Sequence, residues 1–129
     1  AKYEEKDIAQ LMLNNKLTIG KLAASAVYRS DKVPFAYDYA DADTNVSGGD
    51  SHGTHVAGIV GANSGGVVTG VAPDAQLMIM KVFGDNSDGA YDDDILAALD
   101  DAVKLGADVI NMSLGSPAGF SEASSKTMR

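Results

Sequence analysis

The segment that most constrains the fold of this chain is residues 75–83 (AQLMIMKVF), which are apolar almost without interruption. A strand with one buried face alternates apolar and polar residues, whereas a strand buried on both faces of a parallel sheet does not. We therefore expect a buried parallel strand at residues 75–83 and a polar turn at residues 84–89. This strand and the 14 glycines against 3 prolines favour an α/β fold over a helical bundle.

A helix and a second strand are predicted after that turn. Three aspartates, Asp92 to Asp94, begin the helical segment, where carboxylates stabilise the positive end of the helix dipole. Gly106 is a typical helix stop. Residues 108–112 (DVINM) predict another buried strand, so residues 75–113 are expected to form a parallel, right-handed strand–helix–strand unit. The apolar face of the helix is formed by Ile95, Leu96, Leu99, Ala102 and Val103.

The first half of the chain contains three weaker signals. Residues 4–24 carry apolar side chains near helical spacing, with a break expected at Asn14-Asn15. Residues 33–39 are expected to be extended. Residues 52–62 are small, apolar and glycine-spaced, which predicts a helix that packs closely on a sheet.

The composition limits the classes of function. The 129 residues, 45% of them hydrophobic, suffice for one domain with a core. A formal net charge of −8 repels a phosphate backbone, so we do not expect nucleic-acid binding. The absence of cysteine excludes disulfides, a thiolate nucleophile and cysteine-bound zinc. No apolar run approaches the roughly 20 residues of a membrane span, and the first residues lack the apolar stretch of a signal peptide.

Two histidines one helical turn apart, His52 and His55, are the most distinctive candidates for chemistry. Taken alone, the pair fits either an ordinary surface feature or two metal ligands, as in the zinc motif HExxH. The glutamate of that motif is replaced by Gly53, and no third ligand stands nearby. No metal site is therefore predicted.

The ten residues His52–Gly61 (HGTHVAGIVG) resemble the histidine motif of the subtilisin family of serine proteases nearly letter for letter. Three more segments resemble the family in the same order: residues 70–73 (GVAP), 81–84 (KVFG) and 109–115 (VINMSLG). The resemblance implies part of a subtilisin-like parallel sheet flanked by helices. It also implies a serine endopeptidase that cleaves extended polypeptides by acyl transfer.

In that family the first histidine of the motif is the general base, which takes the proton of the serine hydroxyl and returns it to the leaving amine. The resemblance assigns this role to His52 and leaves His55 as a packing residue inside the helix. Gly53 and Gly58 are expected to let the helix lie close to the sheet and the substrate cleft.

The same resemblance assigns substrate-binding residues. In the family the Ser-Leu-Gly backbone, here Ser113, Leu114 and Gly115, pairs with an extended substrate as an added strand. The turn from Gly84 to Tyr91 corresponds to the opposite wall of the cleft, with Tyr91 as the lid of a distal side-chain pocket. An ordinary surface aromatic is an equally good interpretation of Tyr91.

Two motifs of a working member are absent from the sequence: the D-[ST]-G aspartate turn and the G-T-S-[MA] nucleophile elbow. Asp50-Ser51 is followed by His52 instead of glycine, and Ser113 belongs to the substrate-binding strand. We therefore expect a chain that supplies the base and one substrate-binding strand to a longer protease and is inactive alone. A non-catalytic pseudoprotease or peptide-binding module is the alternative.

Residues 32–41 (KVPFAYDYAD), an acidic loop and the histidine motif together resemble the lactocepin-type cell-envelope proteinases of Gram-positive bacteria. This likeness implies a secreted or cell-surface location. It also implies that residues 1–30 are the remnant of a helical insertion and that residues 31–129 are the central part of the peptidase domain.

No cofactor is required for the implied chemistry, but the family often binds calcium near the loop that is residues 63–68 here. Asn63 and Ser64 supply its only side-chain oxygens, so a plain connecting loop is the alternative. One expected partner is a polypeptide substrate. The other is the missing segments of the same protease or a second copy of the chain, because the apolar strand 75–83 exposes an edge when it is cut from its neighbours.

Overall fold

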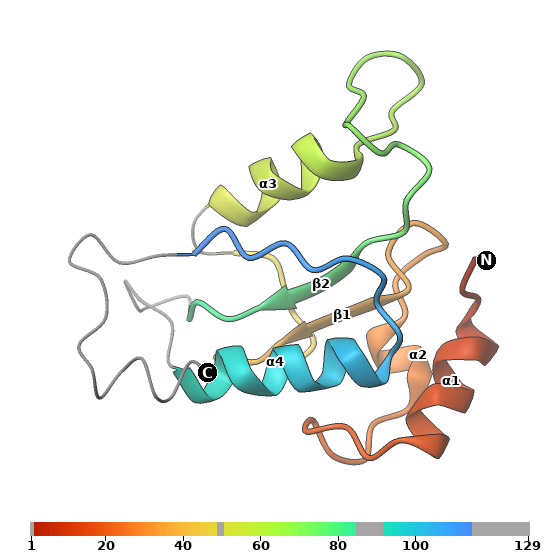
Figure 1. Cartoon of the computed structure of the whole chain (residues 1–129), viewed down its shortest axis with the longest axis vertical. Helices are drawn as coiled ribbons and strands as arrows, with labels where there is room; N and C mark the ends of the chain where they lie inside the picture. The colour runs from red at the N-terminus through yellow and green to blue at the C-terminus, as the bar shows by residue number, and fades with distance from the viewer. Residues whose placement is uncertain (1, 49–50, 85–91, 115–129) are drawn as a thin grey trace.

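The structure, a computed structural model, describes residues 2–48, 51–84 and 92–114. These residues form an α/β arrangement in which helices surround a short sheet (Figure 1), and the predicted fold class is confirmed. No helix in these three ranges is long and apolar enough to cross a membrane. The elements, in chain order, are α1 (Glu5–Asn14), α2 (Ala24–Val27), β1 (Phe35–Asp38), α3 (His52–Gly61), β2 (Met78–Lys81) and α4 (Asp92–Lys104).

The sheet pairs β1 with β2 in parallel, with Phe35 opposite Met78 and Asp38 opposite Lys81. A parallel pair needs a long crossover connection, and α3 lies in the connection between these two strands. The expected extended segment at residues 33–39 and the parallel strand within residues 75–83 are therefore both confirmed. β2 is half-buried instead of fully buried, because β1 is its only strand neighbour among the described residues.

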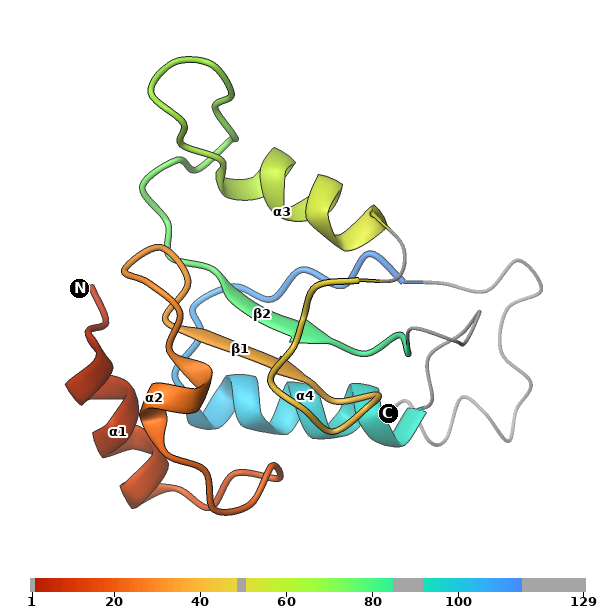
Figure 2. The same cartoon turned by 180° about the vertical axis from the view of Figure 1, so that it is seen from behind.

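The predicted strand at residues 108–112 is wrong for the described part of the chain. In Figures 1 and 2 the trace of residues 107–114 runs along β2, but it joins no sheet. Val109 is 87% exposed and Ile110 is 44% exposed. An apolar run becomes a strand only where a neighbouring backbone pairs with it. The described partner of β2 is β1, which is connected to it through α3, and residues 108–112, which follow α4, pair with no strand.

One hydrophobic core joins the N-terminal helices to the sheet and to α4. Helix α1 ends at Asn14, at the predicted break. The core lies on the α4 side of the strands, whereas α3 buries only Gly61 and adds nothing to the cluster. Its buried members are Ile8, Leu17, Val27, Phe35, Tyr37, Tyr39, Val82, Ile95, Ala98 and Leu105.

A buried carboxylate, that of Asp101, links three segments around this core. Asp101 of α4 is fully buried and accepts hydrogen bonds from the backbone N–H of Thr18 at 2.8 Å and from its hydroxyl at 2.7 Å. The Tyr39 hydroxyl donates to the same carboxylate at 2.8 Å. Helix α4 is thereby fixed both to the end of β1 and to the loop after α1, so the polar group is satisfied as burial requires.

Candidate functional site

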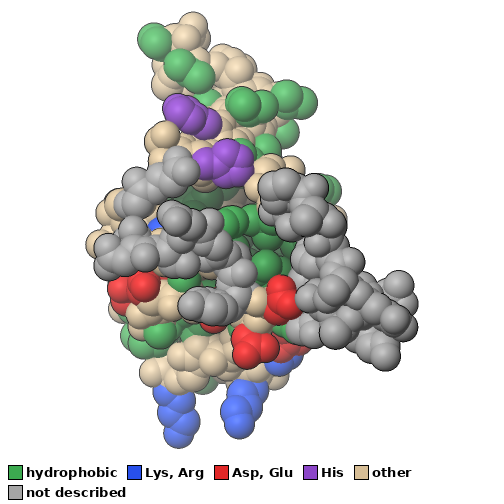
Figure 3. Space-filling model, turned by 90° about the vertical axis from the view of Figure 1, so that its left-hand side faces the viewer, with side chains coloured by type: hydrophobic (Ala, Val, Ile, Leu, Met, Phe, Trp, Pro, Cys, Tyr) green, Lys and Arg blue, Asp and Glu red, His purple; other side chains and the backbone are tan. Residues whose placement is uncertain are grey.

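His52 is the first residue of α3 and its side chain is exposed. The helix begins after Ser51, whose carbonyl accepts the backbone N–H of His55 at 3.0 Å. Figure 3 shows the two histidine side chains of the chain on one face of the molecule, with hydrophobic side chains below them. A base at a helix start is accessible to a substrate in a way that a core histidine is not.

In the described part of the chain, helix α3 is hydrogen-bonded to other segments through its last turn. That turn leaves carbonyl groups without partners inside the helix. The backbone N–H groups of residues 70–72 donate to three carbonyls there at 2.7–2.9 Å: Gly70 to Ala62, Val71 to Ile59 and Ala72 to Val60. Since α3 adds nothing to the hydrophobic core, these bonds are a main determinant of its position.

The packing roles expected for Gly53, Gly58 and His55 are wrong for the described chain. An added Cβ at Gly53 or Gly58 meets no atom within 4 Å, and His55 is exposed, because no described element covers that face of α3. The close approach occurs at the other end of the helix. A Cβ at Gly61 would lie 3.1 Å from Leu77 Cδ2. One at Gly70 would lie 2.7 Å from the backbone nitrogens of Gly61 and Ala62.

Most of the predicted substrate-binding residues fall at one end of the molecule. Ser113 is exposed, Leu114 is half-buried against the core, and Gly84 follows β2 and is half-buried. In Figures 1 and 2 the start of α3, the carboxyl ends of both strands and the end of the 107–114 segment lie at the same end. In α/β folds ligands bind outside the carboxyl ends of the strands. Tyr91 and Gly115 lie outside the described residues.

A charged group that the sequence analysis missed lies at this end. Asp38, the last residue of β1, is buried and forms an ion pair with Lys81 Nζ at 3.1 Å, and Asp41 lies 3.8 Å from the same nitrogen. Burial, together with the charges of Asp93, Asp38 and Asp41, raises the pKa of Asp94 above its usual 3.8. The available signal for this pair was a single charged residue inside each of two largely apolar segments, residues 33–39 and 75–83.

The loop proposed for calcium uses its side chains internally. The Ser64 hydroxyl accepts the backbone N–H of Val68 at 2.9 Å, and the side-chain nitrogen of Asn63 donates to the Pro73 carbonyl at 3.3 Å. The loop has no carboxylate, so its donor set does not fit a Ca²⁺ shell. Across the described ranges no group of three or more histidine, aspartate or glutamate side chains is placed to hold a metal.

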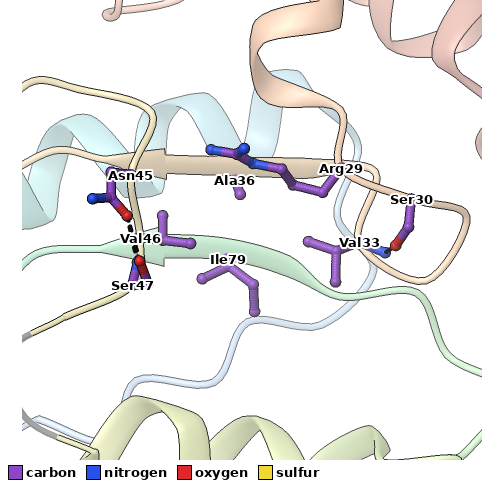
Figure 4. Close-up of a pocket in the computed structure, with 8 residues that line it drawn as sticks. All are labelled: Arg29, Ser30, Val33, Ala36, Asn45, Val46, Ser47 and Ile79. Atoms are coloured by element: carbon purple, nitrogen blue, oxygen red, sulfur yellow. Dashed lines mark hydrogen bonds between the residues drawn. The ribbon is translucent and has the colours of Figure 1, made fainter.

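A cavity of about 340 Å³ lies on the face of the sheet opposite the core (Figure 4). Ala36 of β1 and Ile79 of β2 form its floor. None of the predicted site residues that the structure describes lines it. The remaining lining residues are Arg29, Ser30, Val33, Asn45, Val46 and Ser47.

Comparison with known proteins gives consistent matches. The chain is 45% identical over 102 residues to the PI-type proteinase of Lactococcus lactis subsp. cremoris, an alignment that covers 71% of this chain and 5% of that protein. It is 42% identical over 90 residues to the major intracellular serine protease of Bacillus subtilis (68% and 28% covered). It is 44% identical over 87 residues to the minor extracellular protease Vpr of B. subtilis (66% and 10% covered).

The first of these matches confirms the resemblance to the lactococcal cell-envelope proteinases. The chain spans about one twentieth of the length of that relative. The model of the subtilase family, Peptidase_S8, matches residues 9–129, which is most of the sequence. The chain therefore belongs to the subtilase family, and its relatives are serine proteases.

Proposed function

We propose that this chain supplies the general base, His52, and one substrate-binding segment to a serine endopeptidase. The observation that carries the proposal is the position of His52, exposed at the first residue of α3 and at the carboxyl end of the parallel strands. The family match supports a peptidase function of this kind. The end of the 107–114 segment, which contains Ser113 and Leu114, lies at the same end of the molecule and supplies backbone for an extended polypeptide.

In the proposed reaction the His52 imidazole accepts the hydroxyl proton of a serine as its oxygen attacks the scissile carbonyl carbon. It then gives that proton to the leaving amine, and the acyl-enzyme is hydrolysed by water in a second round of the same transfers. The serine and the aspartate that orients the base are absent from these 129 residues as recognisable motifs. The chain alone is therefore proposed to be inactive.

A pseudoprotease or peptide-binding module is the second candidate. The missing D-[ST]-G and G-T-S motifs are the observation that favours it. It predicts that the full-length protein encoded by the gene also lacks both motifs and binds polypeptides without cleaving them.

We place the protease outside the bacterial cell or on its surface. The likeness to the PI-type proteinase and to an extracellular protease supports this location, although one relative is an intracellular enzyme. Fractionation of cells that express the full-length protein tests the location.

The deciding experiment is labelling with a serine-reactive fluorophosphonate, combined with intact mass under denaturing conditions. The full-length protein encoded by the gene is compared with His52→Ala and with His55→Ala, a matched exposed histidine of the same helix. We expect the full-length protein to take up the label and to cleave a peptide substrate. His52→Ala should lose about 10⁴-fold or more in kcat, while His55→Ala retains most of it.

Labelling that survives in His52→Ala would remove this residue from the role of base. A full-length protein that binds peptide but takes no label would favour the pseudoprotease. The 129-residue chain alone is expected to give a single unlabelled mass.

A further inference from the structure

Lys32 lies just before β1 and contacts the segment that leads from α3 into β2. Its half-buried side-chain nitrogen donates to the Pro73 carbonyl at 2.8 Å and to the Ala75 carbonyl at 2.6 Å. Its own carbonyl accepts the backbone N–H of Leu77 at 2.8 Å. One residue therefore holds this connecting segment at three points.

The same nitrogen lies against the end of α3. A Cβ built on Gly61, the last residue of the helix, would be 3.4 Å from Lys32 Nζ. A cation at this end faces the partial negative charge of the helix dipole, which is a stabilising arrangement. The segment that Lys32 holds continues directly from residues 70–72, which cap the last turn of α3.

Among the described residues, the backbone hydrogen bonds that join α3 to other segments lie at the end opposite His52. A ten-residue helix is about 15 Å long, so a tilt of about 4° about its last turn moves His52 by about 1 Å. A displacement of about 1 Å at a catalytic group can lower the rate by about 10²-fold. A small tilt of α3 about the end near Lys32 therefore causes its largest displacement at His52.

We propose that Lys32 is a positioning residue for His52, acting through residues 70–75 and the last turn of α3. This inference rests on the proposed function of His52 as the base. Lys32 itself touches no reacting atom. Its role is to set the angle of α3 relative to the sheet by binding the carbonyl groups of Pro73 and Ala75 together.

The test compares Lys32→Met, Lys32→Arg and the exposed control Lys21→Met in the full-length protein encoded by the gene. Active sites are counted by fluorophosphonate titration, and kcat is expressed per titrated site. Lys32→Met should lower this kcat about 10- to 100-fold with little change in KM. Lys32→Arg should recover most of the loss, and Lys21→Met should match the wild type.

Amide hydrogen exchange across residues 55–62 and 70–72 is the second measurement, because it does not depend on activity. We expect faster exchange in Lys32→Met and normal exchange in Lys32→Arg. A kcat per site within twofold of wild type in Lys32→Met, or unchanged exchange in these residues, would overturn the proposal. If the wild type takes up no label, the proposed function fails, and the exchange data alone decide whether Lys32 holds α3.

Discussion

Asp101 shows how much of the structure depends on single residues that carry no obvious pattern. Its carboxylate is fully buried and receives three hydrogen bonds, from Thr18 and Tyr39. In the sequence it is one of several aspartates on an amphipathic helix and is indistinguishable from a solvated one. A buried charge is tolerated only when it is fully hydrogen-bonded, so each donor makes a measurable contribution to the free energy of unfolding.

Replacing Tyr39 by phenylalanine removes one donor from this carboxylate. We expect Tyr39→Phe to lower the free energy of unfolding by about 1.5–3 kcal/mol, the range for hydrogen bonds to charged groups. Tyr37→Phe is the matched control, because Tyr37 is equally buried, lies 5.0 Å from the Tyr39 ring, and its hydroxyl has no hydrogen-bond partner among the described residues. Urea unfolding of the full-length protein encoded by the gene measures both; equal midpoints for the two variants would show that the Asp101 bond contributes nothing.

The residues of the candidate site were predictable to different degrees. The position of His52 at a helix start followed from the motif, and the structure places it there. The expected burial of His55 did not hold, because the face of α3 that carries it is uncovered in the described chain. Lys32 and the Asp38–Lys81 pair were missed, since their roles depend on distant contacts. Lys32 and Ala75 are 43 residues apart in the sequence, and so are Asp38 and Lys81.

At the level of elements, α4 begins with Asp92, Asp93 and Asp94, and its third carboxylate lies near the end of β1. Burial and the neighbouring acids raise the pKa of Asp94, so the folded state binds its proton more tightly than the unfolded state does. The stability that this proton provides is fully present below the unfolded value of 3.8. It is lost as the pH rises through the folded pKa.

Asp94→Asn should therefore stabilise the protein at pH 7, and the difference from wild type should vanish below about pH 3.8. Because solvent screens this half-buried group, the gain is small, at most about 0.5 kcal/mol. Asp92→Asn, in the same turn, is the control and should give no gain, since the helix dipole favours a carboxylate there. Thermal unfolding from pH 3 to 8 measures both, and a loss of stability in Asp94→Asn at pH 7 would contradict the sign.

The helices were easier to predict than the sheet. Periodicity and the acidic start identified α4, and the histidine motif identified α3, because helical hydrogen bonds are local. Strands pair with distant backbone, and apolarity alone predicted residues 108–112 as a strand that the structure lacks. The parallel pairing of β1 with β2 could not be read from either segment separately.

At the scale of the whole molecule, many large hydrophobic side chains are exposed among the described residues. Most of these exposed side chains lie on α3, on the loop after it and on the 107–114 segment. They include Ile59 at 68%, Val67 at 85%, Val71 at 87% and Val109 at 87% exposure. The described sheet has two strands, and a sheet of this size is not stable without further packing.

We therefore expect the 129-residue chain alone to unfold without a sharp transition or to self-associate at micromolar concentration. Sedimentation velocity and thermal unfolding, measured at several concentrations, distinguish these outcomes from a stable monomer. If the uncovered apolar surface normally packs on other parts of the full-length protein, adding those parts in trans should raise the unfolding temperature and slow amide exchange in α3. A monomer with a cooperative transition that the added segments leave unchanged would show that α3 and the core are sufficient on their own.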